Sequence, residues 1–139
     1  MRRVTAPDGT EVEIPDVGEK AEHAQLLAIC VAFGLDEAAQ LLLRDPPPRP
    51  FIFDGCSGPV PQELPSGANV VLPCLLHDIE YYTGYSDGPG ADEKRAGADY
   101  RLALNMLAQG ALSHEVDMFL AGVRTAGGFW PDAKWGFGR

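Results

Sequence analysis

Residue types that carry acid–base chemistry cluster in one predicted helix, over residues 69–82. Cys74, His77 and Tyr81 follow each other at helical spacing, so their side chains share one face. The apolar periodicity turns that face inward, where an imidazole and a phenol need hydrogen-bond partners. Asp78 lies about 100° further round the helix, at the edge of this face. It is therefore positioned to reach a neighbouring loop.

The next predicted helix, residues 92–107, carries the expected partner of His77. Asp99 falls on the apolar stripe formed by Leu102, Ala103 and Met106. A carboxylate on such a stripe is destabilising unless it is paired. Paired with His77, it would set the imidazole tautomer and stabilise the imidazolium, while the other ring nitrogen takes a proton from water. The loop between the two helices is short, so we expect them to pack antiparallel.

A glycine-rich loop, Gly55–Pro59, precedes these helices. Calcium prefers about six to eight oxygen ligands, often a mixture of backbone carbonyls and carboxylates. The loop together with Asp78 therefore offers part of a calcium site. A Cys56–Cys74 bridge would tie the loop to the helix and stabilise the fold by about 3 kcal/mol. The chain has three cysteines, so one bridge with a buried Cys30 and three reduced thiols both remain open.

The order of these pieces resembles the phospholipase A2 family. C-x-x-H-D-x-x-Y, from Cys74 to Tyr81, resembles the active-site helix of that family. The upstream GCSG is similar to its calcium loop, and R-x-x-A-D-x-x-L, from Arg95 to Leu102, resembles its second helix. The resemblance covers residues 52–107. The residue pattern is more similar to that of small bacterial and phage-borne relatives than to that of venom or pancreatic enzymes.

This resemblance implies calcium-dependent hydrolysis of a glycerophospholipid acyl ester at a membrane surface. His77 would be the base, Asp99 would orient it, and Tyr81 would hydrogen-bond Asp99. Ca2+ would be held by the Asp78 carboxylate and by backbone carbonyls of the loop, those of Gly55, Ser57 and Pro59. The chain departs from the family where Ser57 and Pro59 replace glycine. It also lacks two family disulfides, at the paired positions Glu80/Ala98 and Pro73/Asn105.

Two other hypotheses compete with an ester hydrolase. The first is a catalytically weak or inactive phospholipase A2-like module that serves binding or structure in a virion or as an effector. The second is a structural zinc site formed by Cys56, Cys74 and His77, whose spacing is suitable but whose fourth ligand is missing unless Asp78 or Cys30 supplies it. An inward histidine can also be a plain core residue. His23 and His114, near helix starts, are expected at the surface.

The rest of the chain predicts a single, mainly α domain over residues 1–139. Residues 3–14 alternate apolar and polar around Asp8-Gly9, which predicts a hairpin with a type I′ turn. N-terminal helices are expected within residues 19–43, the second running over 37–43 with Asp36 as its cap. Residues 51–68 are expected to be loop, with a strand disfavoured. Residues 113–139 predict a helix over 114–124, capped by Ser113, and an aromatic tail. The tail is expected to pack over the core, and a membrane-interface or partner-binding patch is the alternative.

Composition narrows the class of partner. The 139 residues carry a formal charge of −9, and a nucleic-acid binder usually shows a basic patch instead. The same charge favours binding a cation. No apolar run is long enough for a transmembrane helix or for a signal peptide at the N-terminus. The expectation is a cytoplasmic, virion-associated or effector protein without a transmembrane segment.

Overall fold

The computed structural model describes residues 1–56, 63–85 and 89–126 of the chain. These residues form five helices, so the predicted mainly α class is confirmed. The helices are α1 (His23–Phe33), α2 (Asp36–Arg44), α3 (Val71–Thr83), α4 (Ala91–Ala108) and α5 (Ser113–Ala126). None of them has both the length and the apolar character needed to cross a membrane.

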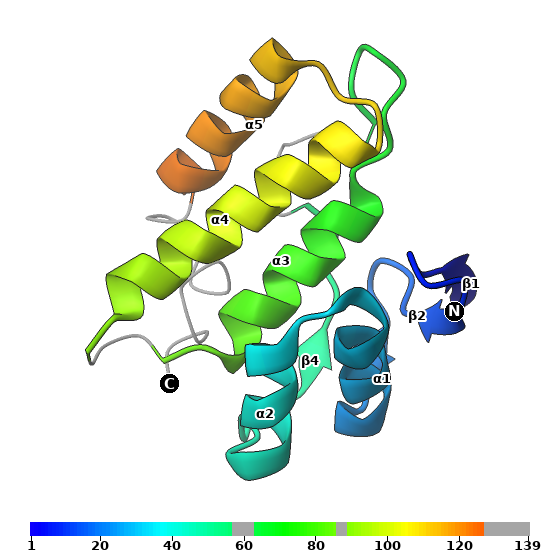
Figure 1. Cartoon of the computed structure of the whole chain (residues 1–139), viewed down its shortest axis with the longest axis vertical. Helices are drawn as coiled ribbons and strands as arrows, with labels where there is room; N and C mark the ends of the chain where they lie inside the picture. The colour runs from blue at the N-terminus through cyan, green and yellow to red at the C-terminus, as the bar shows by residue number, and fades with distance from the viewer. Residues whose placement is uncertain (57–62, 86–88, 127–139) are drawn as a thin grey trace.

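Helices α3 and α4 form the centre of the molecule and run antiparallel, as expected from the short connection (Figure 1). Asn69 stabilises the start of α3, because its side-chain oxygen accepts a hydrogen bond of 2.9 Å from the Val71 amide. Gly84 ends α3, and Gly90 enters α4 with a φ of 77°, a conformation that favours glycine. Helix α5 returns along α4, while α2 contacts α3.

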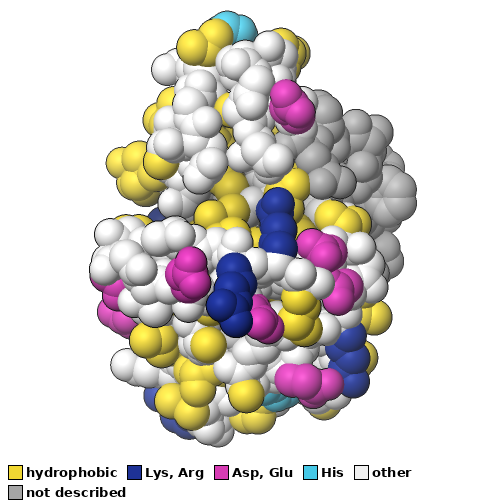
Figure 2. All heavy atoms as spheres, turned by 90° about the vertical axis from the view of Figure 1, so that its right-hand side faces the viewer, with side chains coloured by type: hydrophobic (Ala, Val, Ile, Leu, Met, Phe, Trp, Pro, Cys, Tyr) yellow, Lys and Arg dark blue, Asp and Glu magenta, His cyan; other side chains and the backbone are white. Residues whose placement is uncertain are grey.

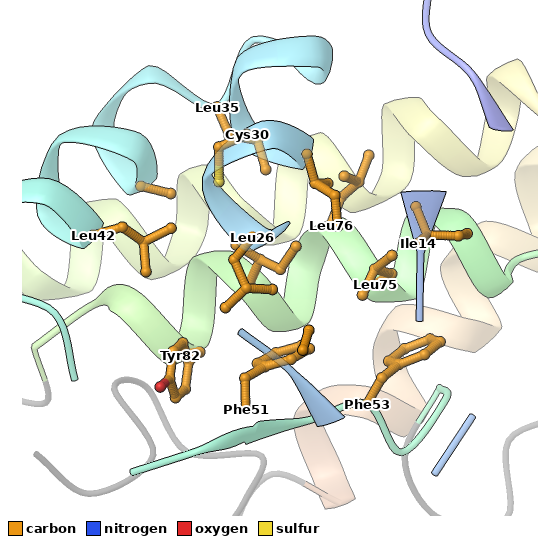
Figure 3. Close-up of a cluster of buried hydrophobic side chains, with 14 of the residues drawn as sticks. Ile14, Leu26, Cys30, Leu35, Leu42, Phe51, Phe53, Leu75, Leu76 and Tyr82 are labelled. Atoms are coloured by element: carbon orange, nitrogen blue, oxygen red, sulfur yellow. The ribbon is translucent and has the colours of Figure 1, made fainter. Parts of the chain in front are cut away.

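Two clusters of buried apolar side chains meet on α3. The first joins α3 to α1, α2, the N-terminal hairpin and the segment around Phe51 (Figure 3). The second joins α3 to α4 and α5 through residues such as Val70, Leu102, Met106 and Phe119. Because α3 contributes to both clusters, its backbone is packed from two sides and provides a firm base for the side chains it presents.

The predicted N-terminal hairpin is present, but its turn differs from the prediction. Strands β1 (Arg2–Thr5) and β2 (Glu11–Ile14) pair antiparallel. The Gly9 amide donates to the Ala6 carbonyl at 2.9 Å, which places Pro7 second in the turn, and Gly9 has a φ of 89°. This is a three-residue hairpin loop with a left-handed glycine, not a type I′ turn. The fixed φ of Pro7 favours the second turn position and shifts the turn by one residue.

A second small sheet lies where the sequence predicted helix and loop. Strand β3 (Lys20–Ala21) pairs with β4 (Phe51–Ile52), so the first helix begins only at His23. Disfavouring a strand at residue 51 was wrong. Phe51 and Phe53 are buried and Ile52 is exposed, which is the alternation of a strand. The glycines and prolines that argued for a loop begin after this segment.

The caps of the shorter helices also differ in detail. Asp36 lies inside the first turn of α2, where it complements the helix dipole, and Leu35 occupies the capping position. At α5 it is Glu115, not Ser113, whose carboxylate accepts a hydrogen bond at the helix start, from the Leu112 amide at 2.8 Å. Glu115 also accepts from the Ser66 amide at 2.9 Å and thereby holds the segment before α3. The predicted aromatic tail, residues 127–139, lies outside the described residues.

Charged side chains are dispersed over the face of the molecule that Figure 2 shows. Acidic residues outnumber basic ones, 20 to 11. On the face drawn in Figure 2 the basic side chains lie singly among acidic and apolar ones. Such mixing is typical of a solvated surface.

The three cysteines divide into one disulfide and one buried thiol. Cys56 and Cys74 form a disulfide, which joins the segment after β4 to the first turn of α3. Cys30 is a free, fully buried cysteine, as predicted. Burial, with a contribution from the charge of Glu80, raises the pKa of the Cys30 thiol to about 12. This thiol therefore stays protonated and acts as an apolar core residue.

We expect the disulfide to stabilise the fold by restricting the unfolded chain. Its cysteines are 18 residues apart, so Cys56→Ser with Cys74→Ser should lower the free energy of unfolding by about 3 kcal/mol. For a chain of this size the melting temperature should fall by roughly 10 °C in a calorimetric scan. The wild type should lose the same stability in reductant, and the double variant should not respond. A reductant-insensitive wild type would contradict the prediction.

Candidate active site

The imidazole of His77 and the carboxylate of Asp99 form a direct pair across the α3–α4 interface. His77 Nε2 lies 2.7 Å from Asp99 Oδ1. Both residues are buried, with exposed fractions of 7% and 8%. Asp99 is flanked on α4 by the buried residues Ala98 and Leu102. The polar pair therefore lies in an apolar interface, where a hydrogen bond between ionisable groups is strong and its loss is destabilising.

Tyr81 completes this network. Its hydroxyl donates to the same Asp99 oxygen at 2.9 Å. The Tyr81 and His77 rings also contact each other, with centroids 4.3 Å apart and planes inclined by 36°. Asp99 Oδ1 thus accepts from two donors on consecutive turns of α3, which holds its carboxylate in one orientation. The structure brings together all three residues proposed as the catalytic set.

The hydrogen bond to Asp99 determines what the other ring nitrogen of His77 can do. Since an ionised carboxylate only accepts, Nε2 is assigned as the donor, and in the neutral ring Nδ1 then carries the lone pair. Among the described residues, Nδ1 has no hydrogen-bonding partner in the protein. A neutral imidazole held in this way can accept a proton from a water molecule or another small donor.

A second acidic pair lies next to this network, on the adjacent flank of α3. Asp78, half-buried, forms a side-chain hydrogen bond with Asp54. Burial, followed by the charge of Asp54 and this hydrogen bond, raises the pKa of Asp78 well above its ordinary value. Two carboxyl groups can hydrogen-bond only if they share a proton, and a cation between them would replace that proton.

Asp54 is a site residue that the sequence analysis missed. Its signal was present: Asp54 stands immediately before Gly55 and Cys56, at the start of the predicted calcium loop. The Cys56–Cys74 bridge brings this segment against α3. Gly55 is buried and has a φ of 79°, a backbone conformation that other residues rarely adopt. Ser57 and Pro59, the other predicted calcium ligands, lie outside the described residues.

The donor set at this position fits calcium better than zinc. Within the described ranges no cluster of three or more His, Cys, Asp or Glu side chains could hold a metal ion. Two carboxyl groups beside a glycine-rich segment are oxygen donors, which suit Ca2+ when backbone carbonyls supply further ligands. The zinc hypothesis required Cys56 and Cys74 as thiolates, and the disulfide between them removes both.

The other two histidines lie away from this site. His114 is exposed, as predicted. The surface prediction for His23 was incomplete, because this half-buried residue lies 3.0 Å from the Tyr82 hydroxyl. That hydroxyl also donates to the carbonyl oxygen of Arg49. The contact is between segments far apart in the sequence, so helical position alone did not reveal it.

An ion pair joins α3 to α4 at Glu80, the residue that the resemblance aligns with a missing disulfide to Ala98. Glu80 on α3 accepts from Arg101 on α4, at 2.8 Å from Nε and 2.6 Å from a terminal nitrogen. Beside it lies a hollow of about 160 Å³, which also contains the pair of Lys94 with Glu37 at 2.7 Å. None of the residues of the His77 network lines this hollow. Its charged groups pair with each other, which indicates a role in holding the helices together.

Comparison of the chain with protein-family models, with characterised proteins and with solved structures finds no match. The geometry of the site and the motifs that build it are therefore what indicate a function.

The acid pair predicts how stability responds to pH and to substitution. A raised pKa in the folded state means that the folded chain holds a proton that the unfolded chain releases. In chelator, the stabilisation from this proton is complete below the ordinary value of 3.8 and is lost as pH rises through the raised pKa of Asp78. Asp78→Asn should therefore raise the free energy of unfolding at pH 7.

The same variant should remove stabilisation by calcium. At a calcium concentration one hundred times the dissociation constant, the wild type should gain about 2.7 kcal/mol, and Asp78→Asn should gain none. Denaturant titrations at several pH values, with chelator and with calcium, measure both effects. Asp36→Asn, at an exposed acid of α2, is the control. If Asp78→Asn instead lost stability at pH 7 in chelator, the ionised Asp78 carboxylate would not be destabilised by its surroundings, and the prediction would be wrong.

Proposed function

We propose that this protein is a phospholipase A2-like hydrolase that cleaves an acyl ester of a glycerophospholipid in a calcium-dependent reaction. The observation that carries the proposal is the buried His77–Asp99–Tyr81 network beside the Asp78–Asp54 pair. His77, Asp99, Tyr81 and Asp78 are the side chains that the resemblance over residues 52–107 predicts for the site, and Asp54 directly precedes the predicted calcium loop. The ester and the lipid come from that resemblance, and the acid–base chemistry comes from the contacts.

The residues of the network divide the proton transfers between them. His77 Nδ1 takes a proton from water as the water oxygen forms a bond to the ester carbonyl carbon. Asp99 stabilises the imidazolium that results, and Tyr81 keeps the Asp99 carboxylate oriented. When the carbonyl reforms, the bond to the leaving alcohol breaks and the same His77 nitrogen delivers its proton to that oxygen. The products are a fatty acid and a lysophospholipid.

The second acid pair is assigned to the cation. Asp78 and Asp54 would hold Ca2+ through their carboxylates, and the carbonyls of Gly55, Ser57 and Pro59 would complete the site. When bound, the ion supplies positive charge that polarises the ester carbonyl and offsets the developing negative charge. The position of Asp78, next to His77 in the sequence, supports this role. The raised pKa of Asp78 supports it too, since an acid pair that must share a proton is favourable for a divalent cation.

Acyl release from phospholipid in millimolar calcium should depend on His77. His77→Gln removes the base and should lower kcat by roughly 10²- to 10⁴-fold. The matched control His114→Gln changes an exposed histidine and should keep wild-type rates. Fatty-acid release is measured by pH-stat titration or mass spectrometry. A folded wild type that releases no acid in calcium would overturn the hydrolase and favour the alternative, a phospholipase A2-like binding module.

Removing the charge of the Asp99 carboxylate should lower kcat more than removing the Tyr81 hydroxyl does. Asp99→Asn keeps the side-chain volume but can no longer stabilise an imidazolium, so kcat should fall by about 10²-fold or more. Tyr81→Phe deletes one donor to Asp99 while His77 remains, and should lower kcat by less than about tenfold. Both variants should leave calcium affinity, measured by calorimetry, close to wild type. Equal effects of the two variants on kcat would argue against this division of roles.

A further inference from the structure

Helix α1 is apolar nearly all round. Among the five helices that the structure describes, it is the one without an Asp, Glu, Lys or Arg side chain. A helix at a protein surface normally carries charged and polar side chains on the face that points away from the core, and a helix that is apolar on every side is normally buried on every side. We therefore expect the exposed face of α1 to be covered by another molecule.

The face in question is the one that α1 turns away from the core. Leu26, Ile29 and Cys30 are buried in the cluster that joins α1 to α2, α3 and the hairpin. In Figure 1, α1 lies at the edge of the molecule, so its opposite side is open. There Val31 is 69% exposed. The exposed and half-buried residues of this side, which we call the α1 outer face, are Ala24, Leu27, Ala28, Val31 and Ala32.

The α1 outer face has one low ridge and one tall ridge. Ridges on a helix surface follow residues that are four apart. Ala24, Ala28 and Ala32 form the low ridge. Leu27 and Val31 form the tall ridge beside it. A two-fold axis roughly parallel to α1 places the tall ridge of each copy over the low ridge of the other, so the face is complementary in shape to itself.

The distribution of charge also favours a second copy of the chain at this face. Two copies that each carry a formal charge of −9 repel each other over most of their surfaces. The α1 outer face has no charged side chain, so contact there brings no like charges together. It also has no Lys or Arg to attract an anionic membrane. Lys20 and Glu22 flank its start with opposite charges, 3.5 Å apart, and the same axis can set each Lys20 beside Glu22 of the other copy.

We infer that two copies of this chain associate through the α1 outer face to form a symmetric dimer. The helix has 11 residues, about three turns, so the contact buries roughly half of the ~800 Å² per partner that is typical of a stable interface. The dimer is therefore weak, with a Kd of roughly 10–100 µM. The inference does not depend on the proposed function.

Sedimentation velocity over a protein concentration of about 1 µM to 1 mM measures the association. The wild type should pass from monomer to dimer in this range. Val31→Glu places a like charge from each copy in the contact and should raise the Kd by about tenfold or more. The matched control Met118→Glu changes a side chain that is 74% exposed on α5 and should associate as the wild type does. A wild type that stays monomeric, or a Val31→Glu variant that dimerises equally well, overturns the inference.

A cysteine cross-link tests the position of the two-fold axis. Ala28 lies midway along the α1 outer face, so Ala28→Cys should form a covalent dimer in mild oxidant. Gln40→Cys, at an exposed position of α2, should not. Cys30 is fully buried and should leave both results unchanged. If Ala28→Cys gives no more covalent dimer than Gln40→Cys, the proposed pairing of the two helices is wrong.

Phosphatidylcholine vesicles distinguish a second copy from a membrane as the molecule that covers this face. Dimerisation without vesicle binding supports the inference. If the wild type binds vesicles and remains monomeric, and Val31→Glu loses vesicle binding, the face binds lipid and the inference is overturned.

Discussion

The buried carboxylate of Asp99 is the constraint around which the centre of this molecule is organised. Within an apolar helix interface, an unpaired charge would destabilise the fold by several kcal/mol. His77 and Tyr81 supply two donors to one oxygen of this carboxylate, and both come from α3. The crossing of α3 and α4 is therefore set by polar contacts as well as by apolar packing. The same contacts leave His77 with one nitrogen engaged and the other able to accept a proton.

The helix that carries His77 is held from both sides. One apolar cluster joins α3 to the N-terminal half of the chain and the other joins it to α4 and α5. The Glu80–Arg101 ion pair adds a further contact between α3 and α4. Such an ion pair stabilises a fold less than a disulfide does. The packing of α3 from two sides supplies most of the stabilisation between the helices. The helices that carry the His77 network are therefore held mainly by packing, and the described residues contain a single disulfide.

That disulfide has a local consequence as well as a global one. Cys74 lies one turn before Asp78 on α3, and Cys56 follows Asp54 by two residues. Bridging the cysteines brings the two carboxyl groups together, so the acid pair is a product of the covalent connection.

The sequence by itself determined the features that depend on local periodicity. Helical spacing placed His77 and Tyr81 on one face of α3 and Asp99 on the buried stripe of α4, and a short loop required the helices to be antiparallel. The hairpin and the buried state of Cys30 also followed from pattern. Turn chemistry was less secure, since Asp8-Gly9 suggested one turn and Pro7 enforced another.

Only the tertiary structure decided the contacts between segments distant in sequence. The choice between a disulfide and free thiols at Cys56 and Cys74, the pairing of Asp54 with Asp78, the contact of His23 with Tyr82 and the β3–β4 sheet are of this kind. Spacing along one helix or strand constrains which side chains share a face. Spacing does not determine which distant segment packs against that face, because that depends on how all the apolar surfaces are buried together.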